Sequence, residues 1–283
     1  MLVFVSILIL ISLIRYMIFS NYRFELSFKD LSQLENKIKF CLANDINKIN
    51  IPCKGLLKKE FFNETFEYLN NNYENLDVFY HYSLHHQYFK NRENSYKKFL
   101  EFIQKFNSNK NNNRILLVSG SNKKKNFDVI KVLSDFKNES NYNTNFGIAY
   151  NPYLEKYYRI YDERERFKQK IDSGLINSIW LQFGTDINLL EREINYIKRF
   201  NRDKKINIYG SLLVPSKQFI SRFKFRPWKG VHISEEYLKS LDNFYFFTKD
   251  LISFYIDNEI CPVIETEFSS PEKLNQLYKI INV

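Results

Sequence analysis

Phe24-Glu25-Leu26-Ser27-Phe28 is the first of eight short apolar runs in this chain, and amphipathic stretches with helical spacing alternate with the runs. The runs begin near positions 23, 48, 77, 114, 146, 178, 207 and 261. Eight alternations of strand and helix predict a closed parallel (β/α)8 TIM barrel, an α/β fold whose chemistry lies at the strand ends. The single carboxylate of the first run, Glu25, would then face the barrel mouth.

Two other stretches support this interpretation. Arg114–Val118 is apolar after its first residue, which is typical of a strand that helices cover on both faces. A long segment at 215–240 separates the seventh strand from the last helix. It contains Arg226-Pro227-Trp228-Lys229-Gly230, which is too aromatic for a disordered loop, so we expect this segment to be functional.

Composition limits the class of protein. A length of 283 residues suits one barrel, and 44% hydrophobic residues supply its core. The net charge is +10, but lysine and arginine are scattered and no nucleic-acid-binding motif occurs, so we expect no nucleic-acid partner. Three cysteines without a CxxC pair exclude a disulfide framework and a cysteine zinc site, and they favour the cytoplasm.

The N-terminus is a separate segment of about 20 residues, with the barrel expected at 21–283. Residues 2–19 are almost wholly apolar, apart from Arg15, and are near the lower length limit of a membrane span. They lack the basic start and cleavage site of a secretory signal. Three interpretations stay open: a membrane anchor with the body in the cytoplasm, which we favour; an apolar helix covering the barrel floor; and a targeting or mis-started segment.

Three polar residues at strand ends are candidates for chemistry. A desolvated Glu25 would hold its proton more tightly and could act as a general acid, although a structural ion pair is an equal alternative. His81 precedes His85 and His86, but no second ligand-bearing element supports a metal site, so we expect no metal and a hydrogen-bonding role for His81. Gln182 can donate and accept at the edge of a heterocycle, or simply end its strand.

Other residues give weaker signals. Glu163 and Lys170 lie seven apart on one helix face and by themselves predict an exposed charged surface. The backbone N–H groups of Ser119-Gly120-Ser121, after the fourth strand, could bind a phosphate. The chain contains no GxGxxG, Walker loop, HExxH or GxSxG motif, which removes the common nucleotide, zinc-protease and serine-hydrolase signatures.

Taken in order, the stretch from Arg23 to Glu265 resembles the methylenetetrahydrofolate reductase barrel. Segments that carry the resemblance are FELSF at 24–28 (family FEFFP), GIAYNP at 147–152 (V-A-x-Y-P), KQKIDSG at 168–174 (L-K-x-K-V-D-A-G), LQFGTD at 181–186 (T-Q-F-F-F-D) and IYGSLLVP at 208–215 (P-G-I-x-P). The second half of the chain gives the more specific match.

The resemblance implies roles for particular residues. Glu25 falls on the general acid of the family and Gln182 on the glutamine that contacts folate. The remaining matches concern cofactors: His81 is the third-strand histidine, Tyr150 lies beside the flavin, and Glu163 and Lys170 contact the dinucleotide. Ser121 stands where the family has the Asp of its R-G-D strand end.

Two departures bear on the flavin. The R-G-D sequence is replaced by Ser119-Gly120-Ser121, and the Thr-Tyr-Gly of the second strand has no counterpart at Pro52-Cys53. Both departures weaken the case for FAD. In this respect the chain resembles the relatives that reduce methylene-folate without a flavin, and its RPWKGV sequence at 226–231 resembles a loop of those relatives.

The resemblance therefore implies reduction of 5,10-methylenetetrahydrofolate to 5-methyltetrahydrofolate by NAD(P)H, with or without FAD. Its partners would be folate and nicotinamide molecules, with membrane contact through residues 2–19. The first alternative is a non-catalytic folate- or flavin-binding barrel tethered to a membrane. Another is a different one-carbon barrel, such as a methyltransferase partner, although the chain has no thiol cluster for the zinc-dependent kind.

Overall fold

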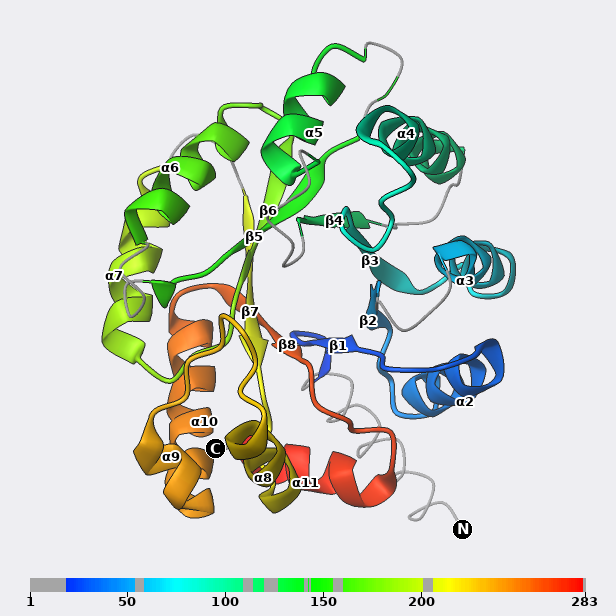
Figure 1. Ribbon diagram of the computed structural model, residues 1–283. Coiled ribbons are helices and arrows are strands. Elements are labelled where there is room, and N and C mark those ends of the chain that lie inside the picture. Colours follow the sequence, from blue (N-terminus) through cyan, green and yellow to red (C-terminus); the bar gives the residue numbers. More distant parts are fainter. Residues whose placement is uncertain are drawn as a thin grey trace.

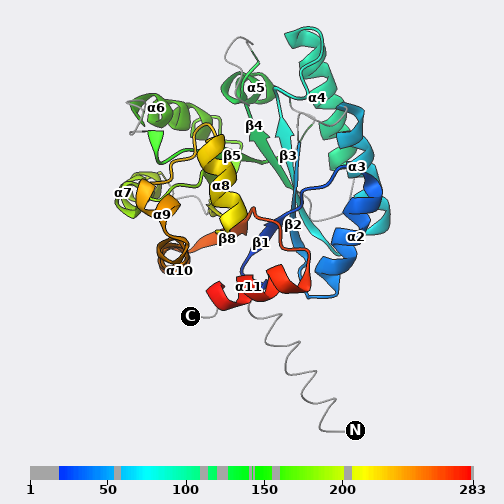
Figure 2. The same cartoon turned by 60° about the horizontal axis from the view of Figure 1, so that its bottom comes forward.

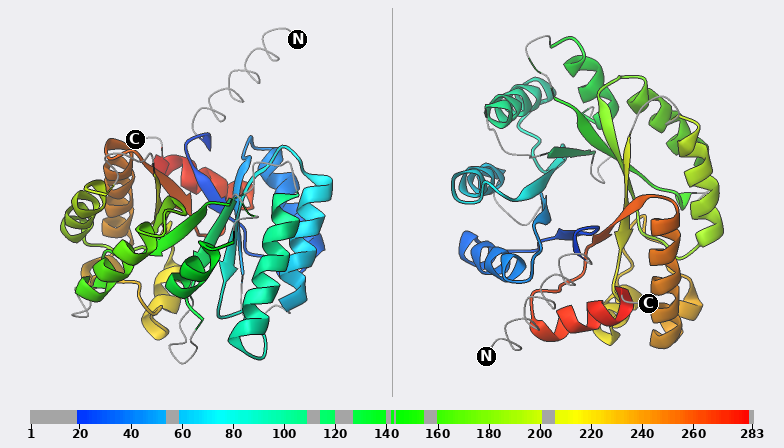
Figure 3. Two further views of the ribbon diagram at one scale, coloured as in Figure 1. Left: turned by 90° about the horizontal axis from the view of Figure 1, so that it is seen from above. Right: turned by 180° about the vertical axis from the view of Figure 1, so that it is seen from behind.

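Eight parallel strands close into a barrel in the order of the sequence, β1 to β8, in this computed structural model (Figure 1). The structure describes residues 19–53, 59–108, 114–119, 127–139, 142, 144–154, 160–200 and 206–281. Helices surround the strands on the outside, as the two views of Figure 3 show. The predicted (β/α)8 barrel is confirmed.

The strands are short, and every pair of neighbours is parallel. They are β1 (Arg23–Glu25), β2 (Lys48–Pro52), β3 (Asp77–Ser83), β4 (Arg114–Val118), β5 (Phe146–Tyr150), β6 (Ile176–Leu181), β7 (Asn207–Leu212) and β8 (Ile260–Ile264). The helices are α2 (Leu31–Leu42), α3 (Lys59–Asn72), α4 (Arg92–Asn107), α5 (Val129–Phe136), α6 (Ile160–Ile171), α7 (Ile187–Lys198), α8 (Lys217–Phe225), α9 (Glu235–Lys239), α10 (Leu241–Asp257) and α11 (Pro271–Ile281).

Alternation along the first strand orients Glu25. Phe24, Leu26 and Phe28 are buried in the core between the barrel and its helices, and the Phe24 ring lies 4.7 Å from that of Phe268. Successive strand residues point to opposite faces, so Glu25 points into the barrel. The predicted alternation is confirmed, although β1 itself ends at Glu25 and the chain to Phe28 is irregular.

An aromatic layer fills the middle of the barrel. Phe79, Trp180 and Tyr209, from β3, β6 and β7, pack there with two aliphatic residues, Leu116 and Val263. The Trp180 and Tyr209 rings stack with centroids 4.3 Å apart, and Phe79 meets both rings edge to face. This layer separates a polar network at the amino ends of the strands from a cavity at their carboxyl ends.

The polar network is built on Arg23, whose side chain is only 1% exposed. Its guanidinium donates to the Asn50 side chain at 2.9 Å and to the carbonyl oxygens of Ile49 and Asp77 at 2.8 Å, and it lies 3.0 Å from the Asp77 carboxylate. Asp77 also pairs with Arg114, which donates to the Tyr209 hydroxyl at 3.0 Å. The network therefore joins strands from β1 across the barrel to β7.

The expected loop at 215–240 contains two helices, α8 and α9, and α10 begins at Leu241, before the predicted Phe246. Figure 2 shows α8, α9 and α10 grouped beside the barrel. The side chains of Ser216 and Ser240 accept from backbone N–H groups three residues on, which are N-caps that favour a helix start. Helix α11 was not predicted, although Leu274 and Leu277 carry the three-residue spacing of its buried face.

Most of the apolar N-terminal segment, residues 1–18, lies outside the described residues. Phe19 is described, and its ring packs 5.4 Å from Phe24 and 4.8 Å from Tyr278. In the part of the chain that the structure describes, no helix combines the length and apolar character that a membrane crossing needs.

Replacing Arg23 with methionine should lower the free energy of unfolding by about 3 kcal/mol or more, because Asp77 and Asn50 lose a buried partner that methionine cannot replace. Urea denaturation measures the change. The exposed pair Lys98–Glu101 supplies the control: Lys98→Met should cost about 0.5 kcal/mol or less. Equal losses in the two variants would show that the buried network does not hold the barrel together.

Candidate active site at the carboxyl end of the barrel

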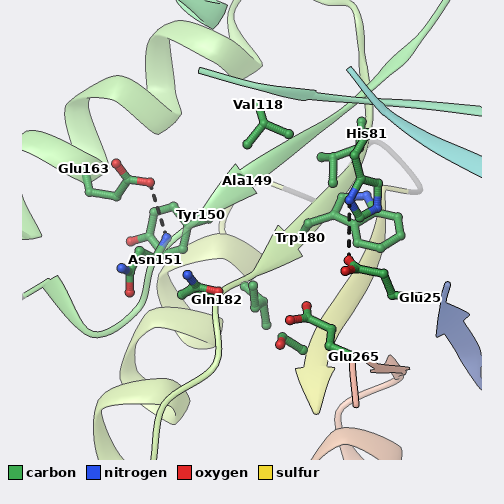
Figure 4. A pocket seen from close by; sticks show the side chains of 13 residues that line it. Glu25, His81, Val118, Ala149, Tyr150, Asn151, Glu163, Trp180, Gln182 and Glu265 are labelled. Atoms are coloured by element: carbon green, nitrogen blue, oxygen red, sulfur yellow. Dashed lines mark hydrogen bonds and ion pairs between the residues drawn. The ribbon is translucent and has the colours of Figure 1, made fainter. Parts of the chain in front are cut away.

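A cavity of about 250 Å³ opens above the aromatic layer, at the carboxyl ends of the strands. Glu25 (β1), His81 (β3), Trp180 (β6) and Gln182, just after β6, line it together with Glu265, just after β8. Figure 4 shows these side chains around one space. Strand ends far apart in sequence are brought together here by closure of the barrel.

Glu25 and His81 face each other across this cavity. Oε2 of Glu25 lies 3.7 Å from Nδ1 of His81, and the two side chains are only 16% and 14% exposed. The His81 ring also meets Trp180 edge to face at 5.5 Å, which fixes its orientation. An acid and an imidazole this close, and this well shielded, can exchange a proton with each other or with a ligand.

Gln182 is held firmly at the end of β6. Its backbone N–H donates to the carbonyl of Tyr150 at 2.9 Å, which extends the ladder between β5 and β6 by one residue. Its carboxamide oxygen accepts from the N–H of Phe183 at 3.2 Å. Trp180 lies two residues earlier and therefore on the same inner face, so an amide edge stands above an aromatic surface.

Tyr150 and Glu163 lie at the β5 side of the cavity, and both line it. Glu163 accepts from the backbone N–H of Asn151 at 3.3 Å (Figure 4). The Tyr150 hydroxyl donates to the buried carboxylate of Glu193 on α7, which Arg164 also binds through two nitrogens. Burial, reinforced by Glu193, raises the pKa of Tyr150, whose hydroxyl thus belongs to the layer between strand and helices.

Lys170 is buried beside β5 and is not among the described residues that line the cavity. Its Nζ donates to the carbonyl of Ala149 at 3.0 Å. Burial lowers the pKa of Lys170, and the nearby Glu163 opposes that shift. The structure thus joins Glu25, His81, Tyr150, Glu163 and Gln182 at one cavity, places Lys170 next to it, and leaves Ser121 outside the described residues.

Sequence reasoning missed several residues of the cavity, among them Trp180, Ser211 and Glu265. A signal for each was available. Trp180 and Gln182 are two residues apart, so their side chains point to the same face of the sheet, and the same holds for Tyr209 and Ser211 on β7. Glu265 follows β8 directly, as Gln182 follows β6. The rule that located Gln182 therefore also locates Glu265.

The charge of the lining limits what this cavity can bind. Three carboxylates line it (Glu25, Glu163 and Glu265), and no lysine or arginine occurs among its described lining residues. Its volume lies below the roughly 300–1,000 Å³ of common ligand pockets. A flat, neutral or cationic ring fits such a cavity, whereas the diphosphate of FAD finds no basic partner in this described lining.

A second cavity of about 250 Å³ adjoins the first, between α8, the chain after β8, and α11. It has a different character, because Phe219 and Trp228 supply aromatic surface, with ring centroids 5.5 Å apart. Its lining carries two cations, Arg222 and Lys273, as well as the carboxylates of Glu265 and Glu267, and Glu267 pairs with Lys37. Glu265 lines both cavities. We call them the inner and the outer cavity.

The segment after α8 is anchored at the barrel mouth. The Asn151 side chain donates to the carbonyl of Gly230 at 2.9 Å, and the N–H of Thr185 donates to the carbonyl of His232 at 3.0 Å. Gly230 has φ +84°, a conformation that glycine adopts without strain. These contacts hold Trp228 in place beside the outer cavity.

Histidine and acid groups in the described residues do not form a metal site: no three His, Cys, Asp or Glu side chains among them are placed to hold an ion. His85 and His86 lie with rings 5.0 Å apart, outside the described lining of the inner cavity. Burial, together with His85, lowers the pKa of His86. The predicted lack of a metal stays a prediction.

Comparison with known proteins establishes the fold. No protein-family model and no curated protein matches the chain. An uncharacterised protein from Clostridium thermocellum that binds two copies of 5-methyl-5,6,7,8-tetrahydrofolic acid has a similar structure, with a TM-score of 0.61 over 95% of this chain and 97% of that chain, at 11% identity. A chitinase domain from Pyrococcus furiosus gives a TM-score of 0.48 over 86% and 82%, also at 11% identity. At such identity the likeness is one of fold alone.

Lys170→Met should reveal the cost of burying this amine. Because burial lowers its pKa below the ordinary 10.5, the folded state binds fewer protons than the unfolded state, and the wild type gains stability as pH rises toward that value. The wild type should therefore become more stable relative to the variant as the pH rises from about 7 to about 10. Urea denaturation across this range measures it; a constant difference would contradict the expectation.

Proposed function

We propose that this protein reduces 5,10-methylenetetrahydrofolate to 5-methyltetrahydrofolate with hydride from a nicotinamide cofactor. The observation that carries the proposal is the meeting of Glu25 and Gln182 in the inner cavity, above the aromatic layer. The sequence resemblance had assigned these two positions to the acid and to the folate-contacting amide. A proton donor and a heterocycle-binding amide at one barrel mouth are what this reaction needs.

The inner cavity suits a pterin ring. A pterin is flat and uncharged, with hydrogen-bonding groups along its edge. Trp180 offers an aromatic surface, and Gln182 an amide for that edge. The acidic lining tolerates a neutral ring and favours any positive charge that develops on it.

The outer cavity suits the rest of a folate. The aminobenzoyl group is an aromatic ring, which matches Phe219 and Trp228, and the glutamate carries carboxylates, which match Arg222 and Lys273. The outer cavity thus offers cationic side chains that the described lining of the inner cavity lacks, which corresponds to the anionic tail of a folate molecule. The Clostridium thermocellum protein, which has the same fold, binds 5-methyltetrahydrofolate and so supports this choice of ligand.

The proposed reaction takes only a few steps. Protonated Glu25 donates its proton to N10 of the five-membered ring as the bond from N10 to the bridging carbon breaks and its electron pair stays on N10. The N5 lone pair forms a double bond to that carbon, giving an iminium cation. Hydride from the nicotinamide then adds to the carbon, and a proton from solvent, passed through His81, restores Glu25.

The remaining candidate residues would hold the wall of the inner cavity against which the pterin ring lies. Glu163 binds the backbone at Asn151, and Lys170 binds the carbonyl of Ala149, so both fix the β5 side of the cavity. Direct transfer from the nicotinamide is favoured because the two sequence departures, at Ser119-Gly120-Ser121 and Pro52-Cys53, fall where the resemblance would require flavin-binding residues. A non-catalytic folate-binding barrel is the second candidate, and the replacement of R-G-D by Ser119-Gly120-Ser121 is what favours it.

Glu25→Gln should abolish folate-dependent oxidation of NAD(P)H while leaving the fold and the affinity for 5-methyltetrahydrofolate nearly unchanged, because glutamine keeps the shape but cannot donate a proton to N10. A loss of at least about 100-fold in turnover is expected from removal of a general acid. Glu191→Gln, an exposed change on α7, is the matched control.

Three outcomes would separate the candidates. Full activity in Glu25→Gln would remove this residue from the mechanism. Folate binding by a wild-type protein that does not oxidise NAD(P)H would establish the binder. A flavin absorption spectrum in the purified protein would overturn direct hydride transfer.

Arg222→Ala and Lys273→Ala should each weaken binding of 5-methyltetrahydrofolate about twofold to fivefold, because each removes a charged partner of the glutamate carboxylates and both side chains are exposed. Calorimetric titration measures the affinity. A tetrahydropterin without the aminobenzoyl-glutamate tail is the control, and its affinity should not change. If both ligands weaken equally, the outer cavity does not bind the tail.

A further inference from the structure

Glu265 occupies the wall between the two cavities. Its backbone N–H donates to the carbonyl of Leu212 at 3.1 Å, which places it directly above the last residue of β8. Phe24 pairs with Ile264 across β1 and β8, so the residues that follow them, Glu25 and Glu265, come at the same level on neighbouring strands. Figure 4 shows both carboxylates directed into the inner cavity.

Ser211 gives an independent indication that a polar ligand group belongs at this wall. Its side chain lies on β7, is buried with 4% exposure, and lines the inner cavity. Its hydroxyl oxygen has no hydrogen-bond partner among the described residues. Buried hydroxyls nearly always have a partner, so a ligand atom is the expected one here.

The position of Glu265 decides which part of a ligand it meets. A folate with its pterin in the inner cavity and its aminobenzoyl tail in the outer cavity must pass the wall that the two cavities share. The atoms that link these two parts are N5, the bridging carbon and N10. They are also the atoms on which positive charge develops when the five-membered ring opens.

We infer that Glu265 is the carboxylate that stabilises the cation formed at N5 and the bridging carbon, with Ser211 binding a polar atom beside it. This inference rests on the proposed function, because it assumes a folate that spans both cavities. When two carboxyl groups lie close together, the pair retains one proton, because two negative charges side by side would repel each other. Glu25 can therefore carry the proton for N10 while Glu265 remains an anion facing the cation.

The test compares a cationic and a neutral ligand by direct binding. 5,10-Methenyltetrahydrofolate carries a positive charge on the N5–carbon–N10 bridge, whereas 5-methyltetrahydrofolate is uncharged there. Wild-type protein should prefer the methenyl compound. Glu265→Gln should reduce that preference about 10- to 100-fold, mainly by weakening the methenyl complex, since an amide has the same shape but no charge.

Matched variants separate charge from packing. Glu265→Asp retains the charge and should keep part of the preference, and Glu191→Gln should keep all of it. Ser211→Ala should weaken both ligands together, because it removes a hydrogen bond and not a charge. If the preference survives in Glu265→Gln, the inference is overturned.

The same measurements distinguish this failure from a failure of the proposed function. A wild-type protein that prefers the cation through Glu265 but does not oxidise NAD(P)H would overturn the reductase and leave the cation site standing. Turnover in the wild type with an unchanged preference in Glu265→Gln would do the reverse. Absence of binding to either folate would overturn both.

Discussion

The buried guanidinium of Arg23 is the contact on which the rest of the structure depends. Strand β1 has only three residues, Arg23–Glu25, so its own ladder hydrogen bonds are few. Arg23 compensates by binding Asn50 and Asp77, and its guanidinium lies 4.7 Å from the centre of the Phe79 ring. Burial lowers the pKa of Arg23, and Asp77 opposes that shift. Because Glu25 is two residues further along the same strand, the network that closes the barrel also positions the candidate acid.

The aromatic layer gives the barrel two chemically distinct ends. Below Phe79, Trp180 and Tyr209 the side chains of Arg23, Asp77 and Arg114 bind one another, which is the behaviour of a structural floor, although Nδ2 of Asn50 has no hydrogen-bond partner among the described residues. Above the layer, three carboxylates and no lysine or arginine belong to the described lining of the inner cavity, whereas the adjoining outer cavity has Arg222 and Lys273 beside its carboxylates. A ligand that is neutral or cationic at one end and anionic at the other is therefore the natural occupant of this mouth.

Much of the fold and part of the site could be predicted from single residues and their spacing. Strand alternation placed Glu25 on the inner face, the position at a strand end singled out His81 and Gln182, and all three line one cavity. The same reasoning would have found Trp180, Ser211 and Glu265. Tyr150 illustrates the limit, because its hydroxyl pairs with Glu193 on α7, and helix packing of that kind leaves no trace in strand spacing. Lys170 was likewise predicted to belong to an exposed charged surface, yet its amine is buried and donates to the carbonyl of Ala149.

The sequence by itself determined the order of strands and helices and which strand residues share a face, since period-two and period-3.6 patterns are local properties of the chain. Only the tertiary structure decided that Glu25 and Glu265, from opposite ends of the chain, lie side by side, and that Glu265 belongs to two cavities. The physical reason is closure. Distances between residues so far apart in sequence depend on barrel register, which the packing of the whole lumen sets.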